Sequence, residues 1–257
     1  MHPDARPIPR VIPCLVLDDE AMVKTVRFEH SAYLGDPINV INLFNRFEVD
    51  EIALLDVRAT VERRPPPFEL IERLAAECWV PLSYGGGIRS LDDVRAILGS
   101  GVEKVILGTA AVDQPELIGA AADVFGSQAV IVAVDARVAD GAYAAFVESG
   151  RRAVGLDPAE HARRAASRGA GEILVTSIDR DGTMEGYDLD LIRRVADAVD
   201  VPVIACGGAG DRSDLAVPIR RAGASAVAAG SLFVFRGRER GVLINFPERS
   251  QLEAIFS

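Results

Sequence analysis

Four aspartates follow apolar, strand-like runs, where carboxylates can act as general acids and bases or bind polar substrate groups. Asp56 ends one run, Asp135 ends another, and Asp179 and Asp181 come just after a third. Burial of such a carboxyl group raises its pKa and lets it exchange protons near neutral pH. We predict Asp135 and Asp181 as the catalytic pair. Any single aspartate could instead cap a following helix or bind loop N–H groups.

A glycine-rich signature occurs twice, each time after an apolar run. The first copy extends from Gly85 to Gly108 and the second from Gly207 to Gly230, the same interval of 23 residues. Glycine turns at strand ends expose backbone N–H groups with no Cβ in the way, and such nests hold phosphate. Two nests imply a small substrate with two anionic ends. We expect this substrate to contact Lys24, Asp56, Gly86, Gly87, Gly108, Thr109, Thr176, Gly182, Gly208, Gly230 and Ser231.

The elements that would position these groups are short apolar runs, which alternate with stretches of helical period. The runs are almost wholly apolar, which is typical of parallel strands covered on both faces. We predict strands over residues 11–17, 51–56, 81–84, 104–107, 129–135, 172–177, 203–206 and 226–229. We predict helices over residues 38–47, 68–78, 91–98, 115–124, 160–167, 189–198 and 213–221.

Strand followed by helix, eight times over, predicts one α/β domain over residues 1–257, folded as a (β/α)₈ TIM barrel. Glu51 and Glu172 open similar runs 34 and 35 residues before Gly85 and Gly207, so the chain is a doubled half-barrel. A doubly wound open sheet is the main alternative, but neither glycine turn has the G-x-G-x-x-G form. In a barrel, the aspartates and both nests would meet at the carboxyl ends of the strands.

Composition argues against several other functional classes. The chain has 257 residues, of which 49% are hydrophobic, and this is enough for a sizeable core. Its net charge of −10 argues against a surface for nucleic acid or anionic membrane. No apolar run approaches the roughly 18 residues of a membrane span, and the first residues lack a signal-peptide core. The three cysteines lack metal-site spacing. We expect a cytoplasmic protein with no metal and no cofactor.

Several motifs, in order along nearly the whole chain, carry a family resemblance. Residues 177–183, Ser-Ile-Asp-Arg-Asp-Gly-Thr, form the most specific one, and residues 10–15, 126–130 and 207–210 also match. They resemble HisF, the cyclase subunit of imidazole glycerol phosphate synthase. The resemblance implies a twofold-repeated (β/α)₈ barrel whose substrate has a phosphate at each end. It also implies a heterodimer with a separate HisH-like glutaminase, which docks on the opposite face and sends ammonia through the barrel.

The same resemblance implies a charged ring, an ammonia gate, at the amino-terminal mouth of the barrel. The family has two basic and two acidic residues there, and the matching positions are Arg10, Glu51, Lys104 and Glu172. A lone pair of this kind is usually a structural ion pair. A full ring of alternating charge favours the gate.

Cysteine and histidine do not point to a glutaminase in this chain. None of the three histidines follows a cysteine in a recognisable triad pattern. We expect Cys14 and Cys206, which lie in strand-like runs, to be small core residues. We expect His30 and His161 at the surface.

The first strand departs from the family pattern. In HisF this strand ends in an aspartate thought essential for the cyclase reaction, and here Val16 occupies that position. The second essential aspartate is matched by Asp135. Valine can neither donate nor accept a proton, and loss of one partner of an acid–base pair lowers the rate by orders of magnitude.

A paralogous branch resembles the chain more closely, namely the HisF-like proteins of acetamidino-sugar synthesis for bacterial surface polysaccharides. The matching segments include residues 23–28, 81–89, 181–188 and 242–247. This resemblance implies a barrel that works with a HisH-like glutaminase and an ATP-dependent sugar amidotransferase. Together these proteins turn an acetamido group into an acetamidino group.

We therefore expect a HisF-type subunit that channels ammonia to a phosphorylated substrate for amidino-sugar synthesis. Two alternatives stay open. One is an authentic imidazole glycerol phosphate synthase cyclase of histidine biosynthesis, in which Asp18 or Asp19 compensates for Val16. The other is a non-catalytic scaffold that only activates its glutaminase.

Overall fold

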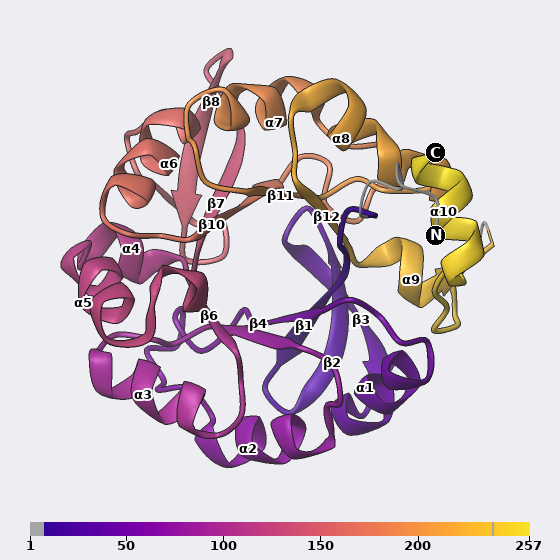
Figure 1. Ribbon diagram of the computed structural model, residues 1–257, viewed down its shortest axis with the longest axis horizontal. Coiled ribbons are helices and arrows are strands. Elements are labelled where there is room, and N and C mark those ends of the chain that lie inside the picture. Colours follow the sequence, from indigo (N-terminus) through magenta and orange to yellow (C-terminus); the bar gives the residue numbers. More distant parts are fainter. Residues whose placement is uncertain (1–7, 238) are drawn as a thin grey trace, which may run out of the picture.

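The computed structural model describes residues 8–237 and 239–257, and its central feature is a closed ring of eight parallel strands (Figure 1). The ring has the order β1–β4–β5–β6–β7–β10–β11–β12, and β12 pairs with β1. The predicted (β/α)₈ barrel is thereby confirmed. The strands are β1 (Val11–Asp18), β4 (Ile52–Asp56), β5 (Leu82–Gly85), β6 (Lys104–Leu107), β7 (Val130–Ala139), β10 (Glu172–Ser177), β11 (Val203–Cys206) and β12 (Ala226–Ala229).

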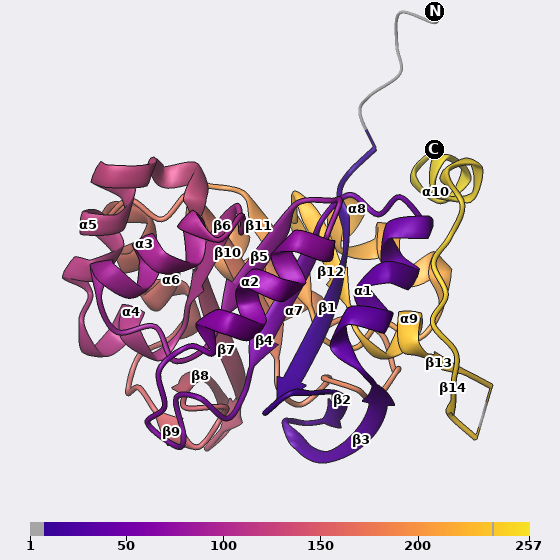
Figure 2. The ribbon, with the colours of Figure 1, turned by 90° about the horizontal axis from the view of Figure 1, so that it is seen from below.

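Helices surround the ring, and their starts follow from local sequence (Figures 1 and 2). Asp36 accepts a hydrogen bond from the N–H of Asn39 at 3.0 Å, and Pro37 follows it in the first turn. Ser90 and Asp93 form a capping box. The helices are α1 (Pro37–Arg46), α2 (Phe68–Glu77), α3 (Leu91–Gly99), α4 (Thr109–Asp113), α5 (Glu116–Phe125), α6 (Pro158–Ser167), α7 (Leu189–Ala196), α8 (Val217–Ala222), α9 (Ser231–Val234) and α10 (Arg249–Phe256).

Two apolar cores lie on the two faces of the strand ring. The larger one packs the strands against the helices and includes the fully buried Phe44, Leu74 and Tyr84. The smaller one fills the barrel interior and includes Ile106 and Leu174. Because the strands are covered on both faces, their sequences read as continuous apolar runs.

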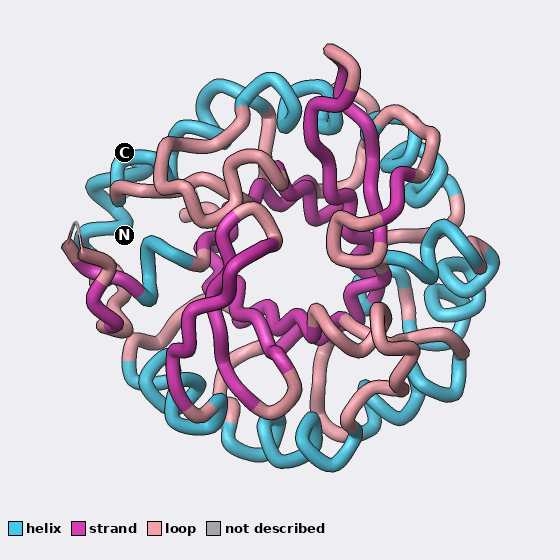
Figure 3. The backbone as a smooth tube through the Cα atoms, turned by 180° about the vertical axis from the view of Figure 1, so that it is seen from behind, coloured by secondary structure: helices cyan, strands magenta, loops and turns pink. Residues whose placement is uncertain are grey.

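Each half-barrel carries an antiparallel hairpin after its first strand, and neither hairpin was predicted from the sequence. The strands β2 (Ala21–Val26) and β3 (Glu29–Gly35) follow β1, and β8 (Ala142–Val147) and β9 (Arg152–Ala153) follow β7. Figure 3 shows the two hairpins on opposite sides of the barrel mouth. The twofold repeat thus extends to the rim of the barrel.

The predicted single helix over residues 213–221 is wrong. This segment begins as a 3₁₀ turn, η2 (Arg212–Ala216), and continues as α8, with Pro218 in the first turn of α8. Another 3₁₀ turn, η1 (Ser127–Ala129), precedes β7, and a short hairpin of β13 (Phe235–Arg236) and β14 (Gly241–Val242) follows α9.

None of the helices in the described part of the chain is both long enough and apolar enough to cross a membrane.

Candidate active site

A cavity of about 900 Å³ opens at the carboxyl ends of the barrel strands. This is the face seen in Figure 3, where the two hairpins flank the mouth. The cavity brings together residues that are far apart in the sequence. Its lining includes Val16, Lys24, Asp56, Gly86, Gly87, Gly108, Thr109, Asp135, Thr176, Asp181, Gly182, Gly208, Gly230 and Ser231.

Asp135 has the chemistry of a proton-transfer group. It lies on β7 beside Thr176 of β10 and borders the cavity. Burial raises the pKa of Asp135 to about 7, a hydrogen bond from Thr176 opposes this rise, and the charge of Asp181 adds to it. A carboxyl group with this pKa is present in both protonation states at neutral pH. It can therefore donate or accept a proton there.

Asp181 is held by two neighbouring residues of β2. Lys24 Nζ lies 2.8 Å from Oδ1 and 3.1 Å from Oδ2, and Thr25 Oγ1 donates to Oδ2 at 3.1 Å. All three side chains are buried, so the ion pair joins the first hairpin to the loop after β10. Asp179 instead binds the outer end of β7, where its Oδ2 accepts the N–H of Val138 at 2.9 Å.

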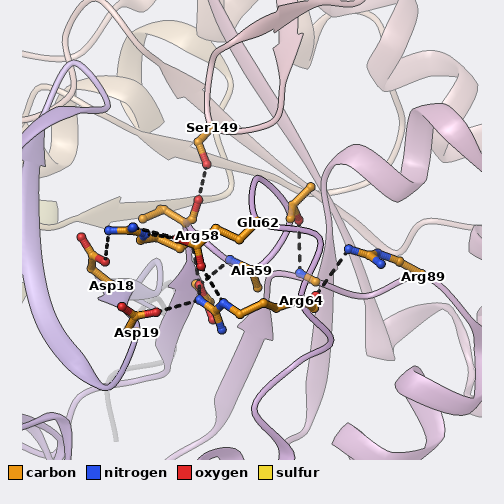
Figure 4. A network of polar contacts seen from close by, with 12 residues as sticks. Asp18, Asp19, Arg58, Ala59, Glu62, Arg64, Arg89 and Ser149 are labelled. Atoms are coloured by element: carbon orange, nitrogen blue, oxygen red, sulfur yellow. Dashed lines mark hydrogen bonds and ion pairs between the residues drawn. The ribbon is translucent and has the colours of Figure 1, made fainter.

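Val16 is buried and borders the cavity from β1. Its two acidic neighbours are engaged elsewhere. Asp18 Oδ1 accepts a hydrogen bond from Arg58 at 3.1 Å, and Asp19 Oδ1 accepts one from Arg64 at 3.0 Å (Figure 4). Each carboxylate thus pairs with an arginine at the rim of the cavity and does not take the position of the missing aspartate.

The arginines belong to a charged network that orders the loop between β4 and α2 (Figure 4). Glu62 accepts from Arg58 Nε and from Arg64 Nε, both at 2.7 Å. Ser149, from the turn after β8, donates to a backbone carbonyl of this loop at 2.7 Å. Neither these residues nor Thr25 could be predicted as part of the site, because loop charges and a single strand threonine carry no periodic signal.

The first nest follows β5, and two of its glycines have backbone conformations that disfavour other residues. Gly86 and Gly87 have φ of 130° and 71°. A Cβ on Gly86 would lie 2.5 Å from the carbonyl oxygen of Asp56. The Asp56 carboxylate is fully buried, and its Oδ1 accepts the N–H groups of Arg58 and Ala59 at 3.0 and 2.9 Å. Burial raises the pKa of Asp56. Its side chain thus orders the loop beneath the nest.

Polar groups of the first nest are already used within the protein. The Gly87 N–H donates to Thr60 Oγ1 at 3.2 Å, and Thr109 Oγ1 accepts the N–H of Glu148 at 3.1 Å. An anion at the Gly87 N–H must therefore compete with an internal hydrogen bond, whereas the Thr109 hydroxyl can still donate one.

The second nest keeps a free hydroxyl group. Gly208 has φ of 112°, and a Cβ there would collide with the carbonyl oxygen of Gly186. Ser231 Oγ is buried and has no hydrogen-bond partner among the residues that the structure describes. Lys24 packs so closely on Gly230 that a Cβ there would lie 2.9 Å from Lys24 Cε. A phosphate at this nest would find a hydroxyl donor and a nearby cation.

The four predicted gate residues form a closed ring at the opposite end of the barrel. Arg10 Nη1 lies 2.7 Å from Glu51 Oε2, and Arg10 Nη2 lies 2.6 Å from Glu172 Oε1. Lys104 Nζ lies 2.8 Å from Glu51 Oε2 and 3.4 Å from Glu172 Oε2. Each cation bridges both carboxylates, and Glu51 is only 2% exposed.

Between this ring and the cavity, the barrel interior is lined by apolar side chains. Cys14 and Cys206 lie at the cavity end and are buried, as expected. A neutral molecule can cross such an interior at low cost, whereas an ion loses its hydration. The other lining residues include Ile12, Ala53, Ile106, Ile131, Leu174, Ile204, Ala226 and Ala228.

The expected surface position of His161 is wrong, whereas His30 is exposed as expected. His161 lies on the inner face of α6 and is 4% exposed. Burial lowers its pKa to about 4, and the charge of Arg164 acts in the same direction. Histidine carries no apolar signal in a periodicity analysis, so its inward position was not recognised.

By fold and site the chain is a twofold-repeated (β/α)₈ barrel with a polar cavity at the face where such barrels carry catalysis. The family model for histidine biosynthesis proteins matches residues 10–238. Two relatives are provisionally named as subunits of imidazole glycerol phosphate synthase. Subunit HisF of Leptospira interrogans is 44% identical over 250 residues, covering 96% of this chain and 98% of the relative. Subunit hisF2 of Pseudomonas aeruginosa is 48% identical over 245 residues, covering 95% and 98%. The chain belongs to the HisF family of synthase subunits.

Proposed function

We propose that the barrel receives ammonia from a separate HisH-like glutaminase and delivers it to a phosphorylated substrate at the cavity. The charged ring and the apolar interior behind it carry this proposal. Neutral NH₃ would cross the interior at low cost, whereas NH₄⁺ would pay a large desolvation penalty. The ring would seal the entrance until the glutaminase docks on the amino-terminal face as a heterodimer partner. Its longest ion pair, 3.4 Å between Lys104 and Glu172, is the natural place to open.

We propose further that the ammonia serves the conversion of an acetamido to an acetamidino sugar. An amide carbon accepts ammonia only after its oxygen has been activated, and an ATP-dependent sugar amidotransferase would supply that activation as a second partner. The ammonia nitrogen then forms a bond to the amide carbon, the activated C–O bond breaks, and a proton is released. This role suits a cavity in which valine replaces the family's aspartate at position 16 and the Asp181 carboxylate is bound by Lys24 and Thr25.

The two nests restrict how such a substrate can bind. They follow strands on opposite sides of an eight-stranded ring, whose diameter is about 15 Å for strands about 4.8 Å apart and tilted by about 36°. The adjacent phosphates of a nucleotide sugar could therefore occupy only one nest. The second nest, with the free Ser231 hydroxyl, is the better prepared of the two.

An authentic imidazole glycerol phosphate synthase cyclase is the second candidate. The pKa of Asp135 near 7 and the names of the relatives favour it. It would need a second acid in place of Val16, and Asp18 would first have to leave Arg58. Restored growth of a cyclase-deficient histidine auxotroph by this gene would support the cyclase over the sugar pathway. Continued auxotrophy with expressed, folded protein would support the sugar pathway.

The gate can be tested by comparing two nitrogen sources in the complex with the glutaminase. Lys104→Met and Glu172→Gln should lower glutamine-dependent synthesis and release free ammonia, while synthesis from added ammonia stays largely intact. Arg95→Met is the matched control, because it removes a cation from an exposed ion pair with Asp92. An equal loss of synthesis with glutamine and with added ammonia would indicate that the charged ring consists of ordinary structural ion pairs. Glutaminase stimulation that survives both changes without any leak would indicate a non-catalytic scaffold.

A further inference from the structure

A second cavity, of about 250 Å³, lies in the outer wall of the barrel between α4, α5 and α6. These helices are neighbours in the views of Figures 1 and 2. We propose that this cavity, the α4–α6 pocket, binds a small organic carboxylate with a short apolar body. The residues that line it are Ala111, Val112, Pro115, Ile118, Val154, Leu156, His161, Arg164, Ala165 and Arg168.

His161 gives the pocket an unsatisfied polar group. The residue is 4% exposed, and Nε2 has no hydrogen-bond partner within the described residues. A buried polar atom without a partner costs free energy, and such atoms are rare in native proteins. A ligand with a hydrogen-bonding head group would remove this cost.

Two guanidinium groups give the pocket its charge preference. Arg168 Nη1 donates to the carbonyl oxygen of Arg164 at 3.2 Å, and no carboxylate pairs with Arg168 across residues 8–237 and 239–257. Arg164 is partly neutralised, since its Nε lies 2.7 Å from Glu160 Oε1. Apart from His161, these are the only charged or titratable residues of the lining. The pocket therefore carries net positive charge and favours an anion.

The remaining walls decide which kind of anion fits. Val112, Pro115, Ile118, Val154 and Leu156 make most of the pocket apolar. An inorganic anion would leave these walls without contacts, whereas a planar carboxylate matches the donor fork of an arginine and its apolar body covers the walls. A volume of about 250 Å³ limits that body to a short chain or a single ring.

The pocket is also connected to the first nest through α4. This helix begins at Thr109, whose Oγ1 accepts the N–H of Glu148, and ends at Asp113, which pairs with Arg152 at 2.8 Å. Val112 in the same helix lines the pocket. A bound carboxylate would therefore fix the helix that carries part of the first nest.

The test uses the full chain, labelled with ¹³C and ¹⁵N in histidine, and benzoate as the probe. We expect benzoate to shift the His161 ring signals saturably and to raise the low pKa of His161, while inorganic phosphate at the same concentration does not. The His161 signals can be assigned with a His30→Gln variant and by their low pKa. Arg168→Gln should weaken benzoate binding at least about tenfold, as expected for loss of a charge-assisted hydrogen bond. Arg163→Gln is the matched control, because Arg163 is exposed on the same helix and pairs with Glu160 without lining the pocket.

Three results would overturn the proposal. They are an unchanged His161 signal at saturating benzoate, an equal response to inorganic phosphate, and equal benzoate affinity in Arg168→Gln and Arg163→Gln. Thermal melts of both variants establish that they fold. The outcome does not depend on ammonia transfer or on the sugar pathway, because the measurement follows the His161 ring signals rather than synthesis.

Discussion

The buried ion pair between Lys24 and Asp181 links the first hairpin to the cavity, and its energetic role can be measured. Lys24→Met keeps most of the side-chain length but removes the ammonium group, which leaves Asp181 with Thr25 as its remaining side-chain partner. The side chains of the pair are 5% and 11% exposed, so little water reaches the orphaned carboxylate. Breaking a buried pair by removing one partner costs about 3–5 kcal/mol. Because the cavity hydrates one side of the pair, we expect about 3 kcal/mol.

Thermal unfolding followed by circular dichroism can resolve a change of this size. For a chain of this length, 1 kcal/mol corresponds to about 2–4 °C in Tm, so Lys24→Met should lower Tm by roughly 6–12 °C. The double variant Lys24→Met with Asp181→Asn should recover much of this loss, because no uncompensated charge is left. Arg249→Met is the control for loss of a cation from an exposed pair, and its effect should stay within about 0.5 kcal/mol.

The reasoning would be refuted by either of two results. One is a Lys24→Met variant as stable as the Arg249→Met control. The other is a double variant whose loss equals the sum of the two single losses, since independent sites add and coupled sites do not.

Three further predictions concern protonation, anion binding and catalysis. The pKa of His161 is lower in the folded chain than in the unfolded chain, so its contribution to stability is full above pH 6.5 and is lost as pH falls through about 4. The loss of stability amounts to about 3 kcal/mol at most. In chemical denaturation, the free energy of unfolding should depend less on pH in His161→Gln than in the unmodified chain. An equal pH dependence would contradict the lowered pKa of His161. Ser231→Ala should reduce the rise in Tm caused by phosphate more than Thr109→Ala does, because the buried Ser231 hydroxyl has no partner within the described residues whereas Thr109 Oγ1 already accepts one hydrogen bond. The opposite order would be evidence against this reasoning. The isolated chain should give little or no imidazole ring closure with ammonia, and Val16→Asp should increase this activity. If the unmodified chain instead turned over as fast as an authentic cyclase, Asp18 would be the next candidate for the missing acid.

Much of the fold could be predicted because burial on both faces leaves a direct trace in the sequence. The predicted strands over residues 104–107, 172–177, 203–206 and 226–229 coincide with β6, β10, β11 and β12. The hairpins escaped prediction for the opposite reason. Most of β3 is solvent-exposed, with no buried face, so neither an apolar run nor an alternation of apolar and polar residues marks it.

The composition of the site could be predicted better than its internal contacts. Strand ends in a barrel share one face, and this alone gathers the glycine turns and the carboxylates of Asp56, Asp135 and Asp181 around one cavity. Which groups pair inside that cavity depends on contacts across the chain. Lys24 and Asp181 are 157 residues apart, and nothing in either local sequence shows that they meet. The buried position of His161 and the arginine network of the rim are likewise products of packing.

The doubled architecture makes the differences between its halves informative. Val16 and Asp135 both border the cavity from the first strand of their half, and only the second half keeps the acid. Thr109 and Ser231 follow the matching strands β6 and β12; Thr109 Oγ1 accepts a hydrogen bond from Glu148 N–H, whereas Ser231 Oγ has no partner among the described residues. The second half thus holds both the carboxyl group whose pKa is raised to about 7, that of Asp135, and the unpartnered Ser231 hydroxyl. Ring closure by an acid–base pair needs both halves, but delivery of ammonia through an apolar barrel needs only the interior and the charged ring. This asymmetry is the reason to place amidino-sugar synthesis ahead of imidazole formation.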